Sequence, residues 1–123
     1  MKRSGFTLIE LLVVMAIIAT LLSFVAPNYF KHLDKAKETV LKEDLASLRD
    51  AIDKYYSDTG NYPATLDDLV TKKYLRKIPV DPITESSESW VIVPPIETDK
   101  SGVYDVHSGA PGKSIDGSPY GEW

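Results

Sequence analysis

The sequence contains no cysteine, and this absence limits how its fold is stabilised. No disulfide bond holds the chain together, even in an oxidising compartment where such bonds form. The chain has 123 residues, of which 43% are hydrophobic, so there is room for one small domain beside a long helix. A small domain without disulfides needs to pack its core against another element of the same chain.

Catalytic side chains are also scarce. The only histidines are His32 and His107, and the chain has no Gly-x-Ser-x-Gly turn, no His-Glu-x-x-His helix and no phosphate-binding glycine loop. Asp105 and His107 lie on the same side of a predicted strand, whereas Ser108 lies on the other, so they do not form a triad. The sequence therefore predicts that the protein is not an enzyme.

The chain also lacks a basic stripe. It has 14 basic and 18 acidic side chains, which gives a net charge of −4. An acidic chain of this kind is a poor nucleic-acid binder, so no nucleic-acid partner is expected. The one local exception is a basic cluster that is either a solvated loop or a contact for an acidic neighbour: Lys72, Lys73, Arg76 and Lys77.

What the sequence does contain is an apolar run over residues 6–30 with one charge inside it, Glu10. From Phe6 to Ala26 the run has roughly 20 residues, or about 30 Å of helix, which is enough to cross the apolar core of a bilayer. A carboxylate in such a helix costs about 2.5–3.5 kcal/mol on insertion scales, so Glu10 needs a cationic partner. Membrane lipid is therefore expected around this helix, and an amino terminus is the nearest candidate cation.

The residues around Gly5 resemble a known processing site. Residues 5–14, Gly-Phe-Thr-Leu-Ile-Glu-Leu-Leu-Val-Val, resemble the class III signal sequences of type IV pilins and type II secretion pseudopilins. The resemblance implies that prepilin peptidase cuts between Gly5 and Phe6 and that the new N-terminal Phe6 is methylated. It also implies that Phe6 and Glu10 serve in subunit assembly, where Glu10 meets the amine of a neighbouring subunit.

Two simpler interpretations fit this run less well. A conventional secretory signal has an apolar core of about 7–15 residues followed by small residues at the cleavage site. The core here is longer, and residues 23–26 place bulky side chains where small ones are needed. A plain membrane anchor needs neither a glycine before the run nor Glu10 within it.

The helix is expected to continue beyond the membrane segment. Apolar residues recur at steps of three to five, which predicts an amphipathic helix over residues 31–58: Leu33, Ala36, Val40, Leu45, Leu48, Ile52 and Tyr55. Opposite charges lie four residues apart in the pairs Glu38–Lys42 and Asp50–Lys54. These charges either form a solvated face or set the register between subunits.

Pro27 interrupts the helical pattern between the two segments. It has no amide hydrogen and its ring clashes with the carbonyl of Ser23, so a kink or a loosening of the helix is expected there. The resemblance implies that this segment melts when the subunit passes from the membrane to the filament. A harmless bend at the membrane edge is the alternative.

A second resemblance lies far from the leader, in residues 55–82. Gly60 and Pro63 predict the end of the long helix, and Thr65 with Asp68 predicts the capped start of a short one. Together with the Asp-Pro pair at residues 81–82, these features resemble the major, G-type pseudopilin of type II secretion. Strands are predicted at residues 90–93 and 103–107. The expected fold is α+β and pilin-like, with a long N-terminal helix packed on a small C-terminal antiparallel sheet.

The tail resembles G-type pseudopilins in outline, and in them a loop at this position often holds calcium. Calcium takes six to eight oxygen ligands, several of them carboxylates. Few carboxylates are present here, and the adjacent acidic pair of the family's site is missing. The resemblance therefore leaves three weak calcium candidates, Asp105, Ser108 and Asp116, and no other cofactor.

These features predict a subunit of a type II secretion pseudopilus. Residues 1–5 are its leader, 6–30 the transmembrane and filament-core helix, and 31–123 a periplasmic pilin-like domain, in which 59–123 form the loop, short helix and sheet. Lys2 and Arg3 keep the N-terminus cytoplasmic by the positive-inside rule. Removal of the leader leaves 12 basic against 18 acidic side chains, a net charge of −6.

The resemblance also implies the partners: copies of the chain in a helical filament, minor pseudopilins, prepilin peptidase, and an inner-membrane assembly platform with its ATPase. The filament is expected in the periplasm, where it helps to drive folded proteins across the outer membrane. Two alternatives remain. One is a type IV pilin of a surface fibre for adhesion, twitching or DNA uptake, although many such pilins carry a C-terminal disulfide loop that needs cysteines. The other is a membrane-anchored periplasmic module that never polymerises, in which Glu10 has no role.

Overall fold

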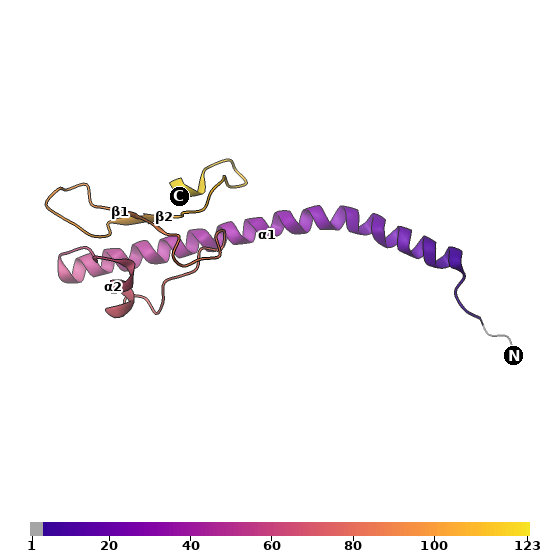
Figure 1. The fold of residues 1–123 in the computed structure, drawn as a ribbon, viewed down its shortest axis with the longest axis horizontal. Coiled ribbons are helices and arrows are strands. Elements are labelled where there is room, and N and C mark those ends of the chain that lie inside the picture. Colours follow the sequence, from indigo (N-terminus) through magenta and orange to yellow (C-terminus); the bar gives the residue numbers. More distant parts are fainter. Residues whose placement is uncertain (1–3) are drawn as a thin grey trace. The chain divides into compact units, whose positions relative to one another are not determined.

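The computed structural model describes residues 4–123, so the leader cations Lys2 and Arg3 lie outside the described residues. In chain order the elements are α1 (Leu8–Thr59), α2 (Leu66–Thr71), β1 (Val91–Val93), β2 (Asp105–His107) and a short 3-10 helix, η1 (Tyr120–Glu122) (Figure 1). The chain divides into two compact units between Asp34 and Lys35, and α1 contributes to both. The long N-terminal helix and the small antiparallel sheet confirm the predicted pilin-like α+β fold.

The first unit contains the N-terminal part of α1. The helix begins after Thr7, whose hydroxyl accepts a hydrogen bond from the Glu10 amide at 3.1 Å, while Glu10 Oε2 accepts one from the Thr7 amide at 3.4 Å. This reciprocal pair is a capping box, and it satisfies two of the amides that a helix start leaves unpaired. The helix continues through Pro27 without a break, and beside it the Asn28 side chain donates to the Phe24 carbonyl at 3.2 Å. The expected loosening at Pro27 stays a prediction.

In the second unit, Lys35–Trp123, one face of α1 is buried. The buried residues recur at helical spacing: Leu41, Leu45, Leu48, Ala51 and Ile52. This part of α1 is amphipathic, as the apolar spacing predicted. Three residues of the predicted apolar face are nevertheless exposed, namely Leu33, Ala36 and Val40. Leu41 lies four residues before Leu45 and so shares its face, whereas Val40 lies five residues before it and points away.

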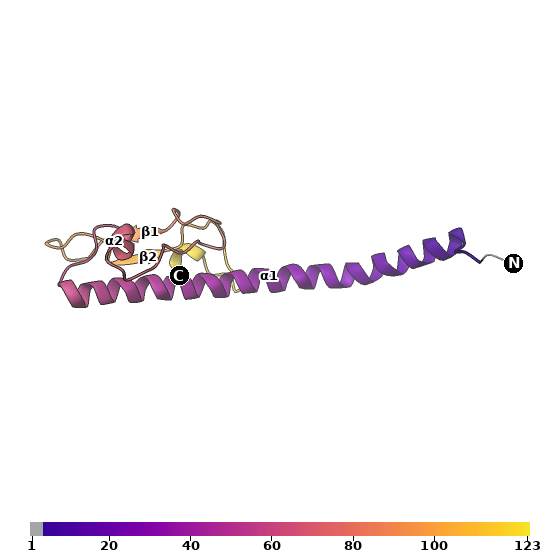
Figure 2. The ribbon, with the colours of Figure 1, turned by 90° about the horizontal axis from the view of Figure 1, so that it is seen from below.

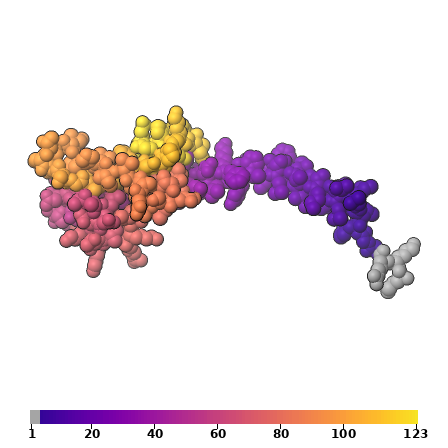
Figure 3. Space-filling model, viewed as in Figure 1, coloured from indigo at the N-terminus to yellow at the C-terminus, as the bar shows by residue number. Residues whose placement is uncertain are grey.

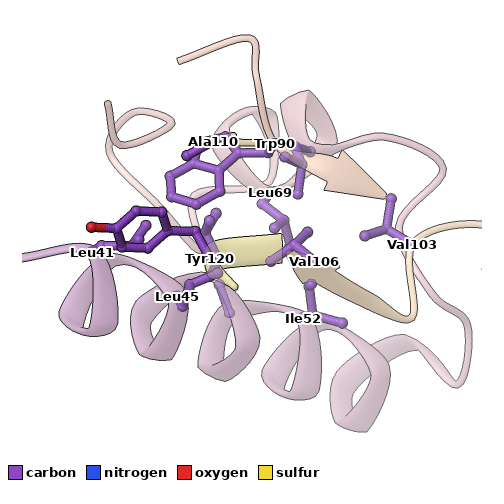
Figure 4. Packing of buried hydrophobic residues seen from close by; sticks show 12 residues of the cluster. Leu41, Leu45, Ile52, Leu69, Trp90, Val103, Val106, Ala110 and Tyr120 are labelled. Atoms are coloured by element: carbon purple, nitrogen blue, oxygen red, sulfur yellow. The ribbon is translucent and has the colours of Figure 1, made fainter. Parts of the chain in front are cut away.

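The core of the second unit forms where later segments cover this face of α1. Figure 4 shows the cluster, to which the segments after α1 contribute Leu66, Leu69, Trp90, Val103, Val106, Ala110 and Tyr120. In Figure 2, α2, β1 and β2 lie on one side of the C-terminal half of α1. The indole Nε1 of Trp90 donates to the Pro79 carbonyl at 2.9 Å, so the ring is buried with its N–H paired.

The sheet is shorter than the sequence predicts. β1 and β2 pair antiparallel with Ile92 opposite Val106, and each has three residues. The predicted second strand began at Val103, but the Val103 amide donates to the Pro63 carbonyl at 2.7 Å and therefore bonds to the loop after α1. Gly102 permits this contact: its φ is +110°, and a Cβ there would lie 2.6 Å from the Pro63 oxygen.

The tail after β2 forms part of the surface of the second unit, where it is drawn in yellow in Figure 3. It makes a close approach at Gly109, because a Cβ there would lie 2.0 Å from the Ser89 carbonyl oxygen. Glycine at this position therefore lets the tail pack directly against the backbone that precedes β1.

Candidate functional site

The expected cleavage site lies in open backbone ahead of α1. Gly5 and Phe6 are exposed and non-helical, and Phe6 is 84% exposed. A Cβ added at Gly5 would meet nothing within 4 Å. Packing within the subunit therefore places no demand on glycine here, so a requirement for Gly5 has to come from an external partner such as a peptidase.

Glu10, the predicted assembly residue, lies in the first turn of α1. Its carboxylate bonds only weakly, through the long 3.4 Å contact with the Thr7 amide, and its side chain remains exposed. Negative charge in the first turn interacts favourably with the helix dipole. The capping box thus holds Glu10 at the helix start with its carboxylate open to a second partner.

The apolar part of α1 has no partner within the first unit. Its large apolar side chains are exposed throughout the run, as at Leu8, Ile9, Leu12, Met15, Leu21, Leu22 and Phe24. Among the described residues, α1 is the one helix whose length and composition allow it to cross a membrane, and its apolar window is wholly unburied. Apolar surface of this extent needs lipid or other helices to cover it.

Arg49 links α1 to the end of the chain. Its Nε donates to Asp105 Oδ1 at 2.8 Å, and its Nη2 donates to the carbonyl oxygens of Val106 at 3.0 Å and Trp123 at 2.5 Å. Sequence reasoning missed this residue. The available signal was its spacing, since Arg49 lies four residues after the buried Leu45 and therefore at the edge of the apolar face.

Glu38 forms a second contact between α1 and the tail. Its Oε1 accepts hydrogen bonds from the Ile115 amide at 2.8 Å and from the Tyr120 hydroxyl at 2.9 Å. The expected Glu38–Lys42 ion pair does not occur among the described residues, whereas the other predicted pair, Asp50 with Lys54, is present at 2.9 Å. Helical spacing could not predict these contacts of Glu38, because both donors lie more than 70 positions further along the chain.

The structure does not bring the three calcium candidates together. Asp105 accepts from Arg49, and Ser108 is buried and donates to Asp81 Oδ2 at 2.5 Å. Asp116 accepts from the Ser118 hydroxyl at 2.7 Å within its own loop. Residues 4–123 contain no group of three histidine or carboxylate side chains placed to hold a metal ion.

Asp81, the first residue of the Asp-Pro pair, organises the loop before β1. Its buried Oδ1 accepts from the Ile83 amide at 2.8 Å, and its Oδ2 accepts from Ser108. Burial raises the pKa of the nearby Asp44 carboxyl, and the charges of Asp81 and Glu43 raise it further. Negative charge is thus concentrated beside α1 in the second unit.

The predicted basic cluster follows α2 on the surface. Lys72, Lys73, Arg76 and Lys77 are all exposed, and none takes part in an ion pair among the described residues. Both interpretations of the cluster, a solvated loop and a contact for an acidic neighbour, therefore remain open.

Comparison with known families identifies both halves of the sequence. Residues 1–26 match the model of the prokaryotic N-terminal methylation motif, and residues 28–117 match that of the type II secretion system protein G. The chain belongs to the type II secretion system protein G family. This membership confirms the resemblance to pseudopilins, including the methylation motif at the N-terminus.

Curated relatives agree with the family assignment. The chain is 39% identical over 97 residues to the type II secretion system core protein G of Pseudomonas aeruginosa, which covers 66% of this chain and 68% of the relative. It is 33% identical over 126 residues to the protein of the same name from Escherichia coli K12, covering 89% and 83%. It is 35% identical over 97 residues to that of Aeromonas hydrophila, covering 66% and 68%. No solved structure was found to match the chain.

Membership of this family makes the chain a type II secretion pseudopilin, a structural subunit and not an enzyme. It favours secretion over the surface-fibre alternative. The apolar N-terminal helix fits anchoring in the inner membrane, and the family implies self-assembly into a filament with other components of the secretion system.

Proposed function

We propose that this pseudopilin is cut after Gly5, methylated at Phe6 and polymerised through the N-terminal part of α1 into a periplasmic filament. The filament then helps to drive folded proteins across the outer membrane. The observation that carries this proposal is the pairing of an unburied apolar helix with one exposed carboxylate, Glu10, in its first turn.

Cleavage supplies the cation that Glu10 lacks. Hydrolysis of the Gly5–Phe6 bond creates a positively charged amine at Phe6, four residues before Glu10 in the sequence. Within one subunit, the Glu10 carboxylate has only the long 3.4 Å contact from the Thr7 amide, so it is open to a cation from another subunit. In a bundle of staggered helices, the Phe6 amine of one subunit meets Glu10 of the next, and the two charges neutralise each other in an apolar surrounding.

The proposed membrane topology depends on the same N-terminal residues. Lys2 and Arg3 hold the leader in the cytoplasm, the helix spans the inner membrane, and the second unit is periplasmic. Prepilin peptidase, the assembly platform with its ATPase, and minor pseudopilins are the partners of this pathway. Melting of α1 around Pro27 accompanies the passage of the subunit from the membrane to the filament, and Pro27 favours this place because its ring leaves one backbone hydrogen bond of the helix unmade.

The test combines intact mass with electron microscopy in a bacterium that carries the cognate secretion genes. The unchanged chain is expected to begin at methylated Phe6 and to form fibres that depend on those genes. Gly5→Leu is expected to keep the full mass of the leader and to form none. A processed chain that stays dispersed in the membrane would instead support the non-polymerising module.

Glu10→Gln isolates the role of charge. Glutamine preserves the capping box because it also accepts from the helix-start amide, so the helix start is expected to remain intact. This variant should be cut and methylated but should form few or no fibres. Glu43→Gln, which neutralises an exposed carboxylate further along α1, is the matched control and should assemble normally. Normal fibres from Glu10→Gln would refute the pairing of Glu10 with an amine.

A further inference from the structure

The resemblance to the family led us to expect a calcium ion in the tail, but the tail loop of this chain, residues 113–119, has different chemistry. Asp105 and Ser108 are already bound, to Arg49 and to Asp81 respectively, in contacts separate from the loop. Only Asp116 remains as a carboxylate within the loop, and calcium prefers several. The residues present therefore do not fit the ion.

The loop around Asp116 is closed by hydrogen bonds of its own. Lys113 and Pro119 form an isolated β-bridge, and the Ser114 amide donates to the Ser118 carbonyl at 2.8 Å. Inside the loop, Asp116 Oδ1 accepts from the Ser114 hydroxyl, from the Ser118 hydroxyl at 2.7 Å and from the Ser118 amide at 3.0 Å. Three donors thus point at the oxygen that an ion would need.

A cationic side chain also lies beside this carboxylate. Lys42 and Asp116 line the same cavity of about 330 Å³, together with Trp123. The Lys42 Nζ lies 4.8 Å from the centre of the Trp123 ring, and the indole Nε1 of Trp123 donates to the Ser118 hydroxyl at 2.9 Å. An ammonium over an aromatic face is attracted to it. The same positive charge repels a second cation from the loop.

The electrostatics agree with this arrangement. Hydrogen bonds from Ser114 and Ser118 hold the pKa of Asp116 at about 2, and the charge of Lys42 contributes in the same direction. Glu38 completes the closure from α1, because it binds the Ile115 amide within the loop. Asp116 is therefore a stable carboxylate whose charge is satisfied by groups of the protein.

We propose that Lys42 and the donors of Ser114 and Ser118 take the place of a calcium ion in the tail loop, so that this pseudopilin folds and remains stable without calcium. The positive charge beside the loop is supplied by α1 itself. This inference concerns the folded subunit and does not depend on the proposed route of assembly.

The first test is thermal unfolding of the full chain purified in detergent, followed by tryptophan fluorescence with calcium or with EGTA. The two midpoints are expected to coincide within about 1 °C. Calcium at about 100 times its dissociation constant would raise the midpoint by roughly 10 °C or more if a site existed. A second probe is Tb³⁺, whose emission bound near Trp123 would be sensitised by the indole. Saturable Tb³⁺ emission displaced by calcium, or a calcium-dependent midpoint that Asp116→Asn abolishes, would overturn the proposal.

Two variants test the part played by Lys42. Lys42→Met keeps most of the side-chain length and removes the charge, and it is expected to lower the midpoint equally in calcium and in EGTA. Lys54→Met removes an exposed lysine from the same helix and is the matched control, expected to have little effect. Equal midpoints for the two variants would refute the role of Lys42. If Lys42→Met fails to fold, the calcium and Tb³⁺ measurements on the unchanged chain still show whether the tail loop binds calcium.

Discussion

Replacing Arg49 by methionine is expected to destabilise the second unit strongly. The guanidinium makes three contacts, with Asp105 and with the carbonyls of Val106 and Trp123. A net hydrogen bond contributes about 1 kcal/mol, and a partly exposed ion pair contributes at most about 1 kcal/mol. The Arg49 and Asp105 side chains are 37% and 30% exposed, so the free energy that this ion pair contributes lies in the lower part of that range. The two hydrogen bonds and the ion pair together give an expected loss of about 2–3 kcal/mol.

The assay is thermal unfolding of the full chain in detergent, followed by circular dichroism. For a unit of this size, about 1 kcal/mol corresponds to roughly 4–8 °C, so Arg49→Met should lower the midpoint by roughly 8 °C or more. Arg49→Lys keeps the charge but cannot make three fixed contacts, so its unfolding midpoint should lie between those of the unchanged chain and Arg49→Met. Lys54→Met breaks only the exposed pair with Asp50 and should change the midpoint little. A midpoint for Arg49→Met within about 2 °C of the unchanged chain would refute the reasoning, because it would mean that water replaces all three contacts.

Three further changes test other parts of the fold. The pKa of Asp44 is raised above its ordinary 3.8, so the folded form binds the proton more tightly than the unfolded form does. Stability therefore falls as the pH rises through the raised pKa, and Asp44→Asn should raise the unfolding midpoint at neutral pH. In a series of midpoints measured at different pH values, the variant should lose this part of the pH dependence. Gly109→Ala should cost about 1–3 kcal/mol because its Cβ would overlap neighbouring backbone, whereas Gly121→Ala, whose Cβ would lie 3.8 Å from its nearest neighbour, should be tolerated in the same unfolding measurement. Pro27→Ala should restore a helical hydrogen bond and reduce the number of fibres, while its leader is still cut after Gly5 and Phe6 is still methylated. Normal fibre numbers would contradict a role for melting at this proline.

The helices could be predicted because their signals are local. The apolar run and the 3.6-residue period predicted one long helix ending near residue 58, and α1 ends at Thr59. The short helix was predicted from Thr65 and Asp68, and the Asp68 carboxylate accepts from the Thr65 amide at 3.4 Å. Each of these signals depends on residues within one or two helical turns.

The contacts that fix the tail could not be predicted in the same way. Arg49 meets Asp105 across 56 positions, and Glu38 meets Tyr120 across 82. Periodicity indicates which face of a helix is buried, but it does not specify which polar residue at the edge of that face meets which later segment. For this reason Glu38 was assigned to Lys42, four residues away, whereas the structure gives it to the tail.

At the N-terminal site, by contrast, the sequence predicted most of the residues and the structure added one. Sequence resemblance marked Gly5, Phe6 and Glu10, while the structure added Thr7 as the partner of Glu10 in the capping box. That contact changes how Glu10 is to be tested. A valine at this position would remove the charge and the helix cap together, so a loss of fibres would have two explanations. Glutamine removes the charge and keeps the cap, so fibres lost with Glu10→Gln but retained with Glu43→Gln would assign assembly to the carboxylate charge alone.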